Sequence, residues 1–254
     1  MKKICLAALC SLSIVFAFGQ DSTRVIARDS VAPTTGYSYT KKTSNLAGRA
    51  NDHFLLQFGI TKWASQPDSI HTKGLSRTFN MYFMFDLPFK SNPHLSVGIG
   101  VGIGTDNIYF NKTYVGIKDA TTTIRFQNVS DTEHFKKYKL TTAILEAPLE
   151  LRYSSHPETP NKSVKVALGV KAGVLLNAHT KGKTLQSSTG TTVLPYTEKI
   201  MSKRFFNSNR FVATARIGYG VFSIFGTYQL NPLFKEALGP DVRPYTIGLT
   251  LSGL

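Results

Sequence analysis

The strictest constraint on this chain is a two-residue alternation between large apolar side chains and small or polar ones. It is clearest between Leu95 and Gly104, where Leu, Val and Ile alternate with Ser and Gly. Because successive side chains of a β-strand point to opposite faces, this period predicts a strand with one apolar face and one nearly bare face. A bare face is typical of a strand whose inner side is crowded by bulky neighbours in a narrow barrel.

The same alternation recurs along the chain and predicts about eight strands. They cover 54–61, 78–87, 95–104, 140–153, 163–177, 210–219, 221–230 and 245–252. The connections between them alternate in length, with gaps at 65–74, 88–93, 105–138, 154–162, 178–209, near Gly220 and at 231–241. Long external loops alternating with short periplasmic turns are typical of outer-membrane barrels. We therefore expect an all-β fold, a transmembrane antiparallel up-and-down β-barrel with both chain ends on the periplasmic side.

The N-terminus has the pattern of a secretory signal peptide. Lys2 and Lys3 precede an apolar run that ends in a small-x-small cleavage site at 17–19. The run is shorter than the roughly 20 residues that a spanning helix needs. We predict a signal peptide at 1–19, a flexible periplasmic segment at 20–50 and the barrel domain at 51–254. Both cysteines, Cys5 and Cys10, fall in the signal peptide, which excludes a disulfide framework in the exported chain.

The formal net charge of +15 narrows the choice of partners. A strongly basic chain invites a nucleic-acid interpretation. Export argues against nucleic acid, and the basic residues are scattered through polar loops. We expect the charge to meet outer-membrane lipid and lipopolysaccharide instead.

The polar strand faces predict a charge network inside the barrel. If these faces converge on a lumen, carboxylates can pair there with basic side chains from other strands, and the pairing would hold the lumen closed. The predicted network consists of Asp86, Glu146, Glu150, Arg152, Lys165, Lys171 and Arg216. The alternative is a soluble sheet whose charges face water. Aromatic residues near the strand ends fit the girdles at the two membrane interfaces, namely Trp63, Phe89, Tyr109, Phe110, Tyr153, Tyr219 and Tyr228.

Motifs that would carry chemistry are weak, and we expect no enzyme, no metal and no cofactor. The six histidines are dispersed without metal-ligand spacing, and no Gly-x-Ser-x-Gly string occurs. Lys181–Thr184 resembles the end of a nucleotide-binding loop, but Asn177 stands where its first glycine is needed. One enzymatic alternative stays open, in which His179 acts with Ser187 or Ser188 on lipid A or phospholipid.

Two strings resemble the PorT-like outer-membrane β-barrel family of Bacteroidetes. Residues 144–153 (ILEAPLELRY) resemble one strand of that family, and 226–234 (GTYQLNPLF) with 245–249 (YTIGL) resemble its closing hairpin. The resemblance covers about 50–254 and implies an integral outer-membrane protein. The namesake of the family is associated with secretion machinery, which implies an envelope or secretion-machinery protein as partner.

The expected function follows from the size of the barrel. About eight strands enclose an interior that side chains fill, so free diffusion of solutes is not expected. We predict a structural or accessory component of the cell envelope that acts through its extracellular loops, chiefly 105–138 and 178–209. A lipid-modifying enzyme, a small-solute pore and a soluble lipocalin-like binding protein are the alternatives.

Overall fold

The computed structural model describes residues 54–252; the predicted signal peptide (1–19) and the predicted flexible periplasmic segment (20–50) lie outside the described residues. The described part is built from strands and one short 3-10 helix, η2 (Pro160–Lys162). The strands are β1 (Phe54–Ala64), β2 (Arg77–Pro88), β3 (Leu95–Phe110), β4 (Thr113–Gly116), β5 (Arg125–Asn128), β6 (His134–Ser154), β7 (Val164–Gln186), β8 (Thr192–Met201), β9 (Asn209–Tyr219), β10 (Phe222–Gln229) and β11 (Arg243–Ser252). Between Phe54 and Ser252, no helix has the length and apolar character needed to cross a membrane.

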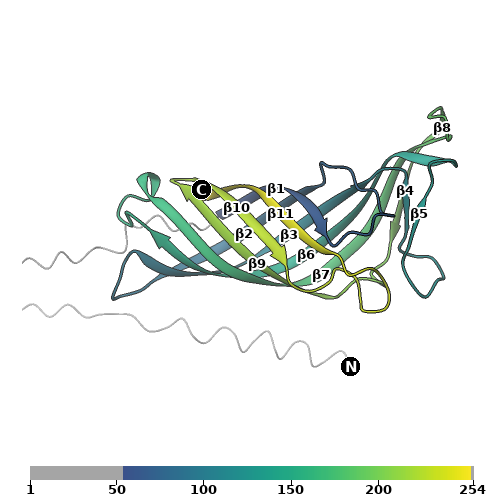
Figure 1. Ribbon diagram of the computed structural model, residues 1–254. Helices are drawn as coiled ribbons and strands as arrows, with labels where there is room; N and C mark the ends of the chain where they lie inside the picture. Colours follow the sequence, from purple (N-terminus) through teal and green to yellow (C-terminus); the bar gives the residue numbers. More distant parts are fainter. Residues whose placement is uncertain (1–53, 253–254) are drawn as a thin grey trace, which may run out of the picture. The chain divides into compact units, whose positions relative to one another are not determined.

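Eight of the described strands close into an antiparallel barrel. Their order is β6-β3-β2-β1-β11-β10-β9-β7, and β7 pairs with β6 to complete the circle. The first and last strands, β1 and β11, are neighbours and pair along almost their whole length. Figure 1 shows these strands crossing obliquely around the barrel. The predicted fold class is confirmed, and neighbouring strands in the chain are neighbours in the sheet.

The outer surface of the barrel is apolar and the inner surface is polar. Large apolar side chains stand exposed on alternate positions, as with Phe58 and Ile60 on β1. The residues between them, such as Gln57 and Thr61, are buried inside. This distribution is the reverse of a soluble barrel, which buries its apolar face, and it matches a barrel surrounded by lipid. The predicted assignment of the strand faces is therefore correct.

The two predicted long loops are shorter than expected, because the strands continue into them. β3 runs on to Phe110 and β6 begins at His134, so the predicted loop 105–138 is cut from both sides. Residues 178–209 contain the end of β7 and all of β8, which pair as a hairpin. Beyond the lipid-facing part the apolar residues move from the outer to the inner positions of the strand, so that Leu140 points inward and Lys139 outward. The pattern of apolar outer faces therefore stops at that point, although the strand continues.

An apolar cluster fills the barrel end that carries the long loops. It joins the ends of β1, β3, β6 and β7 to residues of the loops between strands. Trp63 and Phe110 lie inside this cluster with ring centroids 5.7 Å apart, so their predicted place in a membrane girdle is wrong. The parity of β1 explains the error, because Trp63 follows Thr61 on the inner face. Tyr153, Tyr219 and Tyr228 do remain exposed on the outside.

Candidate functional site in the barrel lumen

The first of two charge clusters in the lumen is built around Arg210. This residue begins the inward face of β9, and its Nη1 atom lies 2.9 Å from Asp106 Oδ2 and 3.3 Å from Glu146 Oε1. Asp106 comes from β3 and Glu146 from β6, so one guanidinium ties three strands together. Both carboxylates are buried. Buried charges are tolerated in proteins when they are paired in this way.

Lys171 joins the same cluster through neutral groups. Its Nζ donates to Gln57 Oε1 at 3.0 Å and to the Tyr82 hydroxyl at 3.0 Å. Tyr82 in turn donates to Glu146. The ammonium also lies 4.6 Å from the centroid of the Tyr82 ring, within cation–π range. A tyrosine hydroxyl therefore links Lys171 to Glu146, where the sequence had suggested a simple ion pair.

The second cluster lies nearer the short-turn end and centres on Glu150. A single oxygen, Glu150 Oε2, accepts from Arg152 Nε at 3.0 Å and from Arg216 Nη2 at 3.0 Å. Arg152 Nη1 also lies 3.7 Å from Asp86 Oδ1. The side chains of both arginines are more than nine-tenths buried. β2, β6 and β9 thus meet at this level of the lumen.

Glycines on the inner faces make room for these large side chains. A Cβ atom at Gly98 would overlap the guanidinium of Arg152, and one at Gly102 would overlap the ring of Tyr82. Both glycines belong to the alternating run of β3. The nearly bare strand face predicted from the sequence is therefore the surface against which the charge clusters pack.

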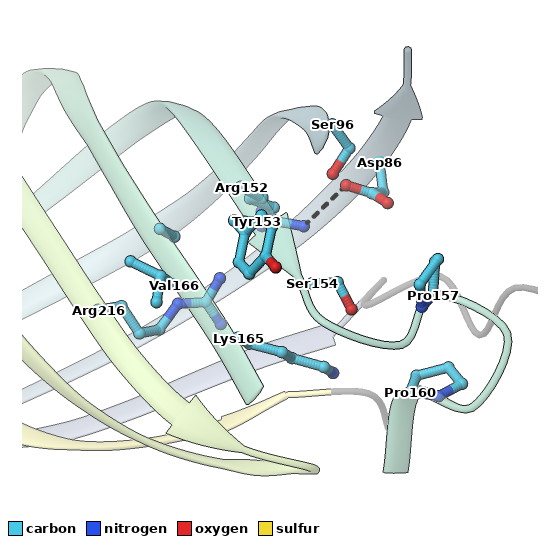
Figure 2. A pocket seen from close by; sticks show the side chains of 11 residues that line it. Asp86, Ser96, Arg152, Tyr153, Ser154, Pro157, Pro160, Lys165, Val166 and Arg216 are labelled. Carbon is cyan, nitrogen blue, oxygen red and sulfur yellow. Dashed lines mark ion pairs between the residues drawn. The ribbon is translucent and has the colours of Figure 1, made fainter. Parts of the chain in front are cut away.

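Six of the seven predicted lumenal residues take part in these contacts. Lys165, the seventh, lines a small cavity at the short-turn end together with Asp86, Arg152 and Arg216 (Figure 2). The network also contains residues that the sequence analysis missed, namely Gln57, Tyr82, Asp106 and Arg210. Parity could have identified Asp106 and Arg210, because they continue the inward faces that include Gly104 and Arg216.

The alternative catalytic pair is not assembled. His179 and Ser187 are eight positions apart along β7 and the turn after it, which at ~3.3 Å per residue is a separation of about 26 Å. Ser187 Oγ instead bonds Thr189 Oγ1 at 2.8 Å. Histidine and a serine nucleophile must lie within hydrogen-bond reach to act together. The pair proposed from loop proximity therefore has no shared site.

Comparison with known protein families decides the class of this protein. The family model described as outer membrane protein beta-barrel domain matches residues 18–250. The chain belongs to this family. No curated protein matches it significantly. As an outer-membrane β-barrel, the chain presents its exposed apolar belt to lipid, and the charge clusters occupy its lumen at the depth of that belt.

Proposed function

We propose that this outer-membrane β-barrel is a closed, non-enzymatic component of the cell envelope, whose long-loop end faces outward and meets a partner protein. We extend the proposal to the PorT-like branch of the family and to a secretion-related partner. Residues 144–153 on β6, and residues 226–234 with 245–249 in the closing β10–β11 hairpin, carry the resemblance that supports this extension.

The observation that carries the proposal is the filling of the lumen at two levels. The Arg210 and Glu150 clusters occupy the level surrounded by the apolar belt, and the apolar cluster around Trp63 occupies the long-loop end. A solute would have to displace both layers. This arrangement favours a structural role over a small-solute pore, since eight strands leave an interior that side chains fill.

The β7–β8 hairpin supports a protein partner at the long-loop end. Among the described strands β8 pairs with β7 alone, so its second edge is open (Figure 1). Val193, Leu194, Tyr196 and Met201 expose large apolar side chains on it. An open strand edge with apolar side chains is a template for pairing with a strand of another chain.

A row of lysines supports lipopolysaccharide as a second partner. Lys139, Lys181 and Lys199 lie directly opposite one another on β6, β7 and β8. Lys137 and Lys183 form a further pair on the same sheet. Like charges in opposite positions repel one another, so the row gains from a polyanion that spans it. The phosphates of lipopolysaccharide supply such charge beside the apolar belt.

The experiment that tests the partner is crosslinked co-purification of the full chain from native outer membranes. We expect one envelope protein to remain bound in detergent and to be lost from Leu194→Asp, because a carboxylate on β8 opposes strand addition. Thr122→Asp, at an exposed position in the connection between β4 and β5, is the matched control. Equal recovery with both variants would show that β8 is not the contact.

Lipopolysaccharide binding has its own test. The double variant Lys181→Gln with Lys199→Gln should retain several-fold less lipopolysaccharide after extraction, measured by mass spectrometry of the purified protein. Lys162→Gln at the opposite end should retain as much as the native chain. The non-enzymatic part of the proposal is tested with the same material, since lipid A incubated with the protein in mixed micelles should keep its mass.

A further inference from the structure

We propose that the lumen holds a small inorganic anion at its short-turn end, bound between Arg152 and Arg216. The cavity there has a volume of about 30 Å³. That is about twice the minimum of roughly 15 Å³ that one water molecule needs, so the space fits an ion of chloride size. Its wall includes Pro157 and Pro160 of the turn between β6 and β7, which places it at the mouth of the barrel (Figure 2).

The hydrogen-bond donors of the two arginines carry this inference. Each guanidinium spends one nitrogen on Glu150 Oε2, at 3.0 Å in both cases. Arg152 Nη2, and Nε and Nη1 of Arg216, are buried and donate no hydrogen bond to the described residues, and Arg152 Nη1 has only the Asp86 carboxylate, 3.7 Å away. A guanidinium has five N–H donors and no acceptor, and leaving charged donors buried without partners is costly. An anion in the cavity would accept from both side chains.

The charge balance points in the same direction. At this level the two buried arginines, Arg152 and Arg216, are matched by two carboxylates, Asp86 and Glu150, and the half-buried Lys165 adds a third basic side chain to the cavity wall. In the Arg210 cluster, Lys171 and Arg210 are balanced by Asp106 and Glu146. Three basic side chains around one small cavity favour an anionic ligand over a water molecule. The position of Lys165 at the rim adds a charge on the path of entry.

Thermal unfolding of the full-length protein in an uncharged detergent tests the site. Gluconate, which is too large for the cavity, is replaced at constant ionic strength by chloride, bromide or phosphate. A ligand that binds only the folded barrel raises the unfolding midpoint with concentration. A rise with the halides identifies a halide site, and a rise with phosphate alone identifies an oxyanion site. Equal midpoints in all four salts would overturn the proposal and leave water in the cavity.

Variants assign the effect to these residues. Arg216→Met should weaken anion affinity at least tenfold, because it removes a charged donor. Lys165→Met, which leaves both arginines in place, should weaken it by a smaller factor and serves if Arg216→Met does not fold. Lys162→Met on η2 is the matched control and should keep native affinity. Crystals soaked in bromide give a direct test where the halides raise the midpoint: an anomalous peak between Arg152 and Arg216 supports the site, and its absence with peaks elsewhere overturns a halide site there.

Discussion

At the residue scale, two glycines that look alike in the sequence occupy opposite environments. A methyl group at Gly102 would overlap the Tyr82 ring and the backbone of β2, whereas a Cβ at Gly226 meets nothing within 4 Å. We predict that Gly102→Ala destabilises the barrel by about 1–3 kcal/mol through overpacking. Gly226→Ala should be neutral or slightly stabilising, since it reduces the freedom of the unfolded chain. Urea unfolding in detergent micelles measures both, and equal stability of the two variants would contradict the packing of β3 described above.

Tyr114, in the β4–β5 hairpin, supplies a second prediction at this scale. Burial and a hydrogen bond of 3.1 Å to Asp119 Oδ1 raise the pKa of its hydroxyl to about 12. Because the folded pKa lies above the unfolded value, the contact stabilises the hairpin fully below pH 10 and is lost as the pH rises toward 12. The difference in absorbance at 295 nm between the native chain and Tyr114→Phe should show an ionisation step near pH 12. Asp119→Asn should move that step down, and a step near pH 10 in the native chain would refute the contact.

At the scale of the element, the sequence identified the strand faces within the lipid belt but not the ends of the strands. Within the belt, the lipid outside favours apolar side chains, and the charge clusters inside favour glycine or polar residues. Both therefore reinforce the same two-residue alternation along the strand. Beyond Asp106 the outside is no longer apolar and the inside no longer polar, as the outward Asn107 and the buried Ile108 illustrate. The phase of the pattern changes there while the strand continues. Arg210 was missed for a related reason, since it is the first inward-facing residue of β9, at the edge of the lipid belt.

The connection between the loop elements and the barrel can be tested through the single tryptophan of the chain. Trp63 packs edge-on against Phe126 of β5, with ring centroids 6.3 Å apart, and against Phe234 at 6.0 Å. We predict that Phe126→Ala lets water reach Trp63, shifts its fluorescence emission to longer wavelength and speeds proteolysis between β4 and β5. Phe58→Ala, on the lipid side of β1, is the control and should leave the emission unchanged. An unshifted spectrum in Phe126→Ala would mean that β5 does not cover Trp63.

At the scale of the whole molecule, the two layers of the lumen close the barrel independently. The Arg210 cluster is held by charge and the cluster around Trp63 by apolar packing, so a substitution that empties one layer leaves the other in place. We predict that the native protein shows no conductance steps in planar bilayers. The double variant Glu146→Ala with Arg210→Ala should also stay silent, because the apolar cluster still fills the long-loop end and the substitution removes one charge of each sign, which leaves Asp106 and Lys171 to balance each other.

An open lumen would require both layers to be permeable to ions. If the Arg210 cluster alone sealed the barrel, the double variant would conduct, and both the Glu150 cluster and the apolar cluster would be permeable to ions. If the native barrel itself gave large, stable steps, neither layer would be a seal, and the small-solute pore would replace the structural role as the better proposal. A heat-modifiability gel on each preparation supplies the control, because a band that shifts on boiling shows that the silent protein is a folded barrel rather than an aggregate. Silence together with that shift is the result expected of a barrel whose function lies in its surface and not in its lumen.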